Sequence, residues 1–208
     1  MMTLRTLCLG ELDTNCYVVW DEHRTAMVID PADEAEKILS VVETERLSLA
    51  AVVLTHAHFD HMLAAEEVCV ATGAPLYVGQ YDAAALSDPV RNLSGVFQMC
   101  PPVRLSADKI LAEGDTLRIG DLAFTVMETP GHTPGCLCLF GEGVLFSGDA
   151  LFYDSIGLVD FPGGDVPAMM ASLRRLAMLP PDVAVYSGHG PATTIAREIK
   201  HNPYLQRI

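Results

Sequence analysis

Most histidines of this 208-residue chain lie within four short segments, two of which contain an aspartate. Residues 55–61 read Thr-His-Ala-His-Phe-Asp-His, which places four side chains of metal-ligand type within six positions. Together the four segments hold seven such residues: His56, His58, Asp60, His61, His132, Asp149 and His189. Imidazole nitrogen and carboxylate oxygen are ligands of zinc, iron and manganese. The sequence therefore predicts a metal site.

Each of these residues has an ordinary interpretation when it is taken alone. A lone histidine after a strand is usually a satisfied polar residue, Asp60 suits a helix N-cap, and Asp149 suits a turn. However, five of the seven histidines lie in the four segments, and only His23 and His201 lie outside them. This clustering favours a joint metal site. His23 and His201 are assigned no role.

Each of the four segments follows a short apolar run that is typical of a buried strand. The runs are residues 51–54, 124–127, 144–146 and 183–186. In α/β folds, sites form beyond the carboxyl ends of strands, on loops that a rigid sheet holds in place. Ligands that are distant in the sequence are therefore expected to converge.

Strand-like and helical patterns alternate along the whole chain, which indicates an α/β architecture. Strands are predicted at residues 15–20, 25–29, 51–54, 76–78, 116–119, 122–128, 136–140, 144–146 and 183–186. Helices are predicted at residues 35–45, at 61–72 with Asp60 as N-cap and Gly73 as the terminal glycine, after Asp165-Val166-Pro167, and at 195–200. Residues 79–105 give no clear pattern.

Composition narrows the class of protein. The formal net charge of −14 disfavours a nuclease, because an acidic surface repels polyphosphate. No export signal and no apolar stretch of transmembrane length is visible, and none of the six cysteines forms a CxxC pair. We therefore expect one domain over residues 1–208, a cytoplasmic location, reduced thiols, and neither nucleic acid nor membrane as a partner.

The motifs resemble those of a known family. Residues 55–61 match the THxHxDH signature of the metallo-β-lactamase superfamily, and residues 129–135, 147–149 and 187–191 match its later metal motifs in order. The similarity extends from residues 14–17 to residues 202–205. It is closest to the short, single-domain relatives of glyoxalase II (hydroxyacylglutathione hydrolase).

The resemblance implies a metallo-β-lactamase αβ/βα four-layer sandwich with two metal ions at one edge. Carried over by position, it gives His56, His58 and His132 to one ion, Asp60, His61 and His189 to the other, and Asp149 to both. It also places Asp30 behind the ligands as a supporting residue. An Asp-Pro turn is the alternative role for Asp30.

The implied activity is that of a metal-dependent hydrolase, with thioesters as substrates and a hydroxide that bridges two divalent ions as the nucleophile. Asp60 and Asp149 are the expected catalytic residues. Zinc is the first expectation for the metal, and iron and manganese are the alternatives. A thioester suits this chemistry because a thiolate leaves without a strong acid.

Other activities of the same fold stay open. A persulfide dioxygenase with one iron shares the motifs, and a hydrolase of a non-glutathione ester is a further alternative. A β-lactamase is disfavoured by the missing export signal. A flavodiiron reductase is disfavoured because His58 stands where that group has a glutamate.

The sequence indicates the residues that contact the substrate less clearly than it indicates the metal ligands. Similar chains read Gly-Arg-Thr-Asp-Phe-Pro-Gly-Gly after the bridging aspartate, whereas residues 157–164 here read Gly-Leu-Val-Asp-Phe-Pro-Gly-Gly. Leu158 and Tyr153 are the candidates for contact with a small-molecule substrate. Leu158 in place of arginine predicts a less charged substrate. Alternatively, Leu158 packs locally and Arg91 or Arg197 anchors an anion. A homo-oligomer is left open.

Overall fold

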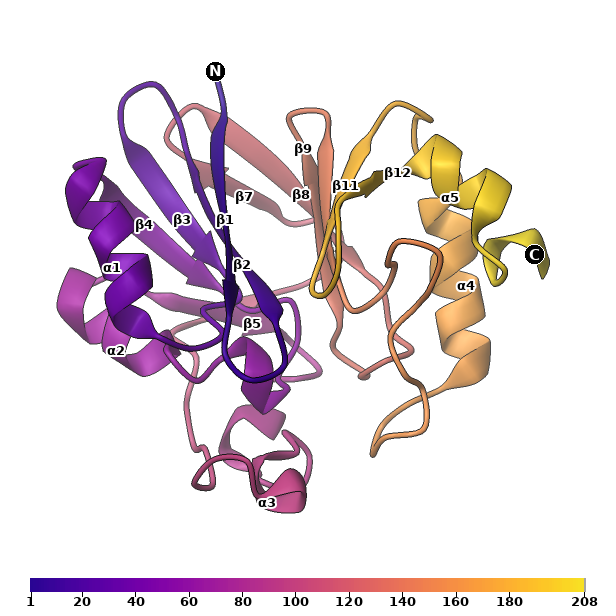
Figure 1. Ribbon diagram of the computed structural model, residues 1–208, viewed down its shortest axis with the longest axis horizontal. Helices are drawn as coiled ribbons and strands as arrows, with labels where there is room; N and C mark the ends of the chain where they lie inside the picture. The colour runs from indigo at the N-terminus through magenta and orange to yellow at the C-terminus, as the bar shows by residue number, and fades with distance from the viewer. Residues whose placement is uncertain (208) are drawn as a thin grey trace.

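The computed structural model describes residues 1–207 and contains two six-stranded mixed β-sheets (Figure 1). In spatial order, the first sheet contains β1 (Thr3–Leu9), β2 (Thr14–Trp20), β3 (Thr25–Ile29), β4 (Ser48–Val53), β5 (Leu76–Gly79) and β6 (Lys109–Leu111). The second contains β12 (Thr193–Thr194), β11 (Ala184–Ser187), β10 (Val144–Gly148), β9 (Leu137–Gly141), β8 (Leu122–Glu128) and β7 (Thr116–Ile119).

Strand direction divides each sheet into two parts. In the first sheet, β1 to β3 are antiparallel, and β3 to β6 run parallel. The parallel crossovers carry α1 (Ala35–Thr44) and α2 (Ala65–Thr72). The second sheet is antiparallel except for the pair β10–β11, whose crossover carries α4 (Val166–Leu176). The last helix, α5 (Ile195–His201), follows β12.

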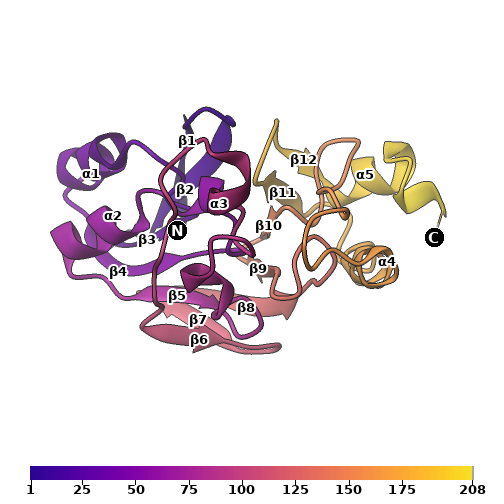
Figure 2. The ribbon, with the colours of Figure 1, turned by 90° about the horizontal axis from the view of Figure 1, so that it is seen from below.

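The apolar runs are continuous because both faces of the strands are covered. In β2, Val18 belongs to the core beneath α1 and α2, whereas Val19 faces the second sheet. In β10, Phe146 faces the first sheet, and Leu145 packs with Leu173 of α4. The layers are therefore helices, sheet, sheet and helices, as Figure 2 shows. The αβ/βα four-layer sandwich expected from the sequence is confirmed.

The helix expected at residues 61–72 is wrong at its start. Phe59–His61 forms a short 3-10 helix, and α2 begins only at Ala65. Asp60 caps no helix, because its side chain accepts a hydrogen bond from Thr14 Oγ1 at 3.2 Å. At the other end, Gly73 has a φ of 74°, which confirms the predicted glycine C-cap.

The other predicted helices are confirmed, and Asp165 accepts a hydrogen bond from the Ala168 amide at the start of α4. The sequence pattern missed β1, β6 and β12. Residues 79–105 contain a 3-10 helix at Ala85–Ser87 and the four-residue helix α3 (Ser94–Phe97). A further 3-10 helix lies at Leu205–Arg207. No helix among residues 1–207 has the length and apolar composition needed to span a membrane.

Candidate metal centre

The loops that follow β4, β8, β10 and β11 meet at one end of the sandwich. The Leu137 amide donates to the Thr55 carbonyl at 2.9 Å, and the Gly188 amide donates to the Gly148 carbonyl at 2.8 Å. These bonds join the loop after the first-sheet strand β4 to the second sheet, and the loop after β11 to the end of β10. The seven residues singled out in the sequence therefore lie together.

The seven side chains form overlapping groups in which one ligand atom from each member lies within 4.8 Å of the others. The groups are His56, His58 and His132; His56, His61 and Asp149; and Asp60, His61 and His189. The first and third groups have the membership that the resemblance implies for two separate ions.

Asp149 lies between the two outer groups. Its Oδ2 is 3.5 Å from Nε2 of His132, and its Oδ1 is 3.4 Å from Nε2 of His61. Asp60 Oδ2 is 3.3 Å from Nε2 of His189. Ligand arms of about 2.05 Å in a tetrahedron give ligand–ligand edges of about 3.3 Å. The spacing therefore suits ions with such arms.

Several of these atoms are buried and have no hydrogen-bond partner among the described residues. They include Nε2 of His56, Nε2 of His61 and Oδ1 of Asp149. An unsatisfied buried polar atom costs about 1–3 kcal/mol, so a cluster of them needs an explanation. Cations provide one, because an unprotonated imidazole nitrogen and a carboxylate oxygen each present a lone pair to a metal ion. The histidine and aspartate clusters suggest a dinuclear metal site whose nitrogen and oxygen donors fit zinc, iron or manganese.

The charge states of the histidines differ between the groups. Burial lowers the pKa of His56 well below its usual value, and lowers the pKa of His58 to about 3. Burial also opposes the charge on His61, but the surrounding carboxylates, with Asp60 the strongest, raise the pKa of His61 to about 10. Since a ligand nitrogen must be unprotonated, metal binding at His61 would release a proton.

Partners behind the ligands fix the orientation of three imidazoles. His61 Nδ1 donates to Asp30 Oδ2 at 3.0 Å. His132 Nδ1 donates to the Leu158 carbonyl at 2.6 Å, and His189 Nδ1 donates to the Leu12 carbonyl at 3.1 Å. In each case the bond holds Nδ1, so Nε2 points toward the other ligands.

Asp30 is buried and contacts the loop that carries the first histidines. Its Oδ1 accepts from the Thr55 amide, and its Oδ2 accepts from Thr55 Oγ1, both at 2.7 Å. Its φ of 49° places it in the left-handed backbone region, just after the end of β3. The structure thus gives Asp30 the supporting contact with His61 that the resemblance implied, and no turn hydrogen bond spans the Asp30-Pro31 step among the described residues.

Residues at the start of β2 hold the loop that carries His189. Asn15 Nδ2 donates to the carbonyls of Ser187 at 3.0 Å and Gly190 at 2.8 Å. Tyr17 Oη donates to the same Ser187 carbonyl at 2.6 Å. Asn15 and Tyr17 therefore position the His189 loop, although they lie far from it in the sequence.

Asp82 is a residue of the site that sequence reasoning missed. Its buried carboxylate accepts from the Ala57 amide at 3.0 Å, from Thr133 Oγ1 at 2.7 Å and from the Gly135 amide at 2.8 Å. It therefore joins the His56–His58 loop to the His132 loop. Burial raises the pKa of this carboxyl, and its hydrogen bonds oppose that rise. Asp82 is one of two aspartates in residues 79–105, a segment without a clear pattern, and nothing in the sequence distinguished it.

Gly188 is required by the close approach of two ligands. A Cβ at this position would lie 2.1 Å from Asp149 Oδ1 and 2.7 Å from His61 Cε1. Any larger residue would displace one of them. Space therefore explains the first glycine of the Ser-Gly-His-Gly motif, whereas the second, Gly190, has a positive φ of 77° and no atom within 4 Å of a Cβ.

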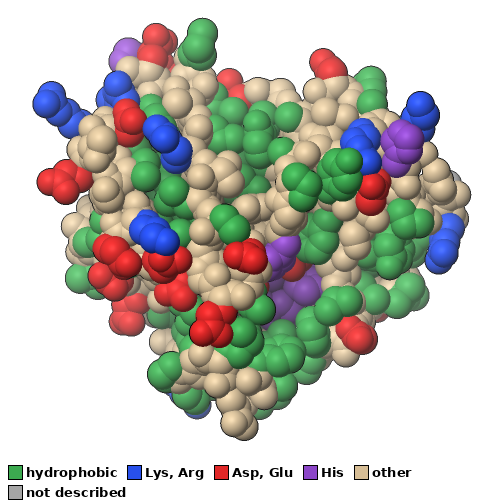
Figure 3. All heavy atoms as spheres, viewed as in Figure 1, with side chains coloured by type: hydrophobic (Ala, Val, Ile, Leu, Met, Phe, Trp, Pro, Cys, Tyr) green, Lys and Arg blue, Asp and Glu red, His purple; other side chains and the backbone are tan. Residues whose placement is uncertain are grey.

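An open cavity of about 510 Å³ lies against the ligands, and histidine side chains are visible in a hollow of the surface bordered by hydrophobic side chains (Figure 3). Leu158 lines this cavity and is 59% exposed, so it does not pack into the core. Tyr153 is not among the lining residues, and its ring lies 3.5 Å from the Arg197 guanidinium carbon.

Comparison with known proteins agrees with the fold. The profile of the metallo-beta-lactamase superfamily matches residues 9–189. Hydroxyacylglutathione hydrolase GloC of Haemophilus influenzae is 31% identical, over 98% of this chain and 98% of that protein.

Two crystal structures are similar over nearly their whole length. BLEG-1, a B3 metallo-beta-lactamase, has a TM-score of 0.93 and 39% identity, covering 98% of this chain and 99% of that one. TTHA1623 in a di-iron-bound form has a TM-score of 0.87 and 37% identity, covering 97% and 100%. The chain therefore belongs to the metallo-beta-lactamase superfamily, and the family and its relatives indicate a metallo-hydrolase.

Proposed function

We propose that this protein is a thioester hydrolase that works with two divalent metal ions. The proposal rests on the two ligand groups, which have Asp149 between them. It also rests on the buried nitrogen and oxygen atoms of these groups that have no hydrogen-bond partner among the described residues. In this assignment His56, His58 and His132 would hold one ion, Asp60, His61 and His189 would hold the other, and Asp149 would be shared between them.

Two ions at this site would lower the pKa of a bound water from about 15.7 toward roughly 7. The side chains of the protein set the charge and the positions of the ligand atoms. Asp60 and Asp149 provide negative charge beside His61, and Asp30 holds His61 by accepting a hydrogen bond from Nδ1 of that histidine. In the overall reaction, water adds to the acyl carbon, the C–S bond breaks, and a carboxylic acid and a thiol form. A thiolate leaves without a strong acid, so the reaction needs no further proton donor.

The comparisons support a hydrolase and leave the metal open. The name of GloC from Haemophilus influenzae specifies a thioester substrate class, which favours the same class here. The di-iron form of TTHA1623 makes iron a real alternative to zinc. The likeness to BLEG-1 makes a β-lactam the second candidate substrate. An amide nitrogen is a poorer leaving group than a thiolate, so we place the thioester first.

The test is hydrolysis by purified protein before and after prolonged chelation. Thiol release from a thioester should disappear on chelation and return with zinc, iron or manganese. A chromogenic cephalosporin in parallel tests the β-lactam, and oxygen uptake with a persulfide tests an iron dioxygenase. Thioester hydrolysis that persists at full rate in the metal-free protein would exclude the proposal, as would oxygen uptake with no hydrolysis.

A further inference from the structure

The cavity beside the ligands has a predominantly apolar wall. Phe97, Phe152, Phe161, Leu158, Leu12 and Met99 line much of it. The Phe161 ring centroid lies 6.0 Å from that of His58, and 5.7 Å from that of Phe97. A bound apolar molecule could therefore contact aromatic carbon directly beside the imidazoles of the metal site.

No lysine or arginine lines this cavity among the residues that the structure describes. Arg197 binds other carboxylates: its guanidinium donates to Asp154 at 2.6 and 2.9 Å and to Glu198 at 2.8 Å. Arg91 lines a separate, smaller pocket beside Asp82. Neither arginine is thus placed to receive an anionic group in the cavity, which excludes the alternative anchors considered from the sequence.

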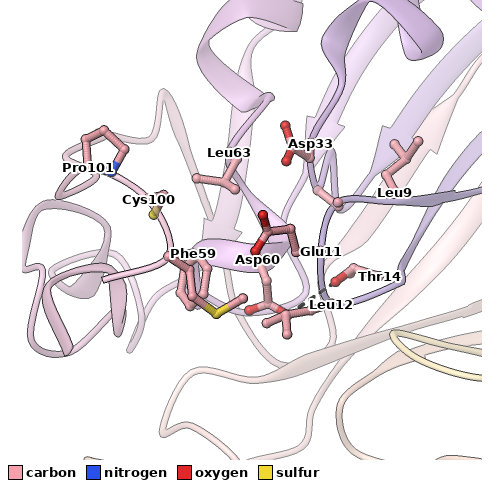
Figure 4. A pocket seen from close by; sticks show the side chains of 13 residues that line it. Leu9, Glu11, Leu12, Thr14, Asp33, Phe59, Asp60, Leu63, Cys100 and Pro101 are labelled. Carbon is pink, nitrogen blue, oxygen red and sulfur yellow. Dashed lines mark hydrogen bonds between the residues drawn. The ribbon is translucent and has the colours of Figure 1, made fainter. Parts of the chain in front are cut away.

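A second cavity, of about 290 Å³, adjoins the first and adds negative charge rather than positive. The two share four lining residues, among them Phe59 and Asp60. Glu11 and Asp33 also line the second cavity, and Figure 4 shows their carboxyl groups around the same space as Asp60. Since Asp60 is assigned to an ion, the like charge that a substrate carboxylate would meet there is that of Glu11 and Asp33.

Leu158 has two separable contributions. Its backbone carbonyl accepts the hydrogen bond that orients His132, and its side chain is exposed in the cavity. A substitution at this position alters the cavity wall but keeps the carbonyl. Substrate selection can therefore be changed here without removing the partner of His132.

We propose that this cavity selects uncharged, apolar thioesters over anionic ones such as those of glutathione, and that Leu158 is a specificity-determining residue. This inference rests on the proposed hydrolase function. It follows from the apolar wall, the missing cation and the neighbouring carboxylates taken together.

The experiment compares two thioesters with the same acyl group in the metal-loaded enzyme. One has a neutral carrier, N-acetylcysteamine, and the other has glutathione, which carries two carboxylates. The wild type should have at least a tenfold higher kcat/KM for the neutral carrier. Leu158→Arg should raise kcat/KM for the glutathione thioester by about ten- to a hundredfold, because arginine binds a carboxylate through two hydrogen bonds. Leu158→Met is the apolar control and should leave the preference unchanged.

The possible failures are distinguishable. If neither thioester is hydrolysed in a metal-dependent manner, the proposed function fails and the inference fails with it. If the wild type hydrolyses the glutathione thioester as well as the neutral one, and Leu158→Arg brings no gain, the function stands and the inference is overturned. Equal metal content in the three proteins shows that a change in rate reflects the cavity and not the ions.

Discussion

Asp30 and His61 form a buried pair in which His61 Nδ1 lies 3.0 Å from Asp30 Oδ2. The same carboxylate accepts two hydrogen bonds from Thr55, the residue before His56. One side chain from the end of β3 thus positions a member of each ligand group. This arrangement lets a residue that need not touch either ion influence both.

Asp30→Asn should weaken metal binding and lower kcat/KM by about 10–100-fold, as loss of a partner behind the ligands typically does. Asparagine tolerates the positive φ of this position, but its NH₂ group must face one of the donors that the carboxylate now accepts. Metal titration of the apo protein measures the effect. Unchanged affinity would show that the contact between Asp30 and His61 does not support metal binding.

Asp149→Ala should be more damaging than Asp30→Asn. Asp149 contacts both ligand groups, so its loss should reduce occupancy at both positions and lower the rate by more than the roughly 100-fold upper value expected for a supporting partner. Metal analysis and kinetics on the same preparations provide the comparison. Equal effects of the two substitutions would mean that the ranking of the two aspartates is wrong.

Asp82→Asn should lower stability as well as activity. The Asp82 carboxylate accepts three hydrogen bonds within the core, and an amide in its place leaves at least one donor unpaired. The expected loss is about 1–3 kcal/mol of unfolding free energy, seen as a lower Tm. Asp182→Asn, at an exposed position, is the matched control and should change neither quantity. A wild-type Tm in Asp82→Asn would contradict the proposed link between the two loops.

Gly188→Ala should lower the number of metal ions bound per chain while changing the Tm only slightly. The added Cβ collides with Asp149 Oδ1 and His61 Cε1, both of which belong to the ligand cluster. Gly143→Ala is the control, since a Cβ there meets no atom within 4 Å, although its φ of 77° adds strain. If metal content falls equally in both variants, the collision at Gly188 is not the cause.

The positions of the histidines in the sequence were enough to predict where the site forms. Apolar strands fix the chain up to residues such as Leu54 and Phe146, and a ligand that follows a buried strand has little freedom. The convergence of four strand ends then follows from the α/β pattern. The four-layer arrangement was implied by the family resemblance alone, whereas the apolar runs indicated only buried strands.

Other features depend on contacts that no local pattern carries. Asp60 has the residue type of an N-cap, but His61, His189 and Thr14 attract its carboxylate, and the helix begins later. Asp82 acts through loops 25 and about 50 residues away in the chain. The strand β1 alternates exposed and partly buried residues at the edge of its sheet, so its apolar signal is weak.

The central claim is that the two ligand groups hold two ions, and the number of metal ions per chain tests it most directly. Metal-saturated and desalted wild-type protein should contain about two ions per chain by elemental mass spectrometry, a count that follows from two groups with the ligand numbers of zinc sites. His189→Ala, which removes a member of the Asp60, His61 and His189 group only, should retain about one ion. A wild-type protein that binds one divalent ion or none, or a metal-free protein that hydrolyses thioesters at the full rate, would contradict the account.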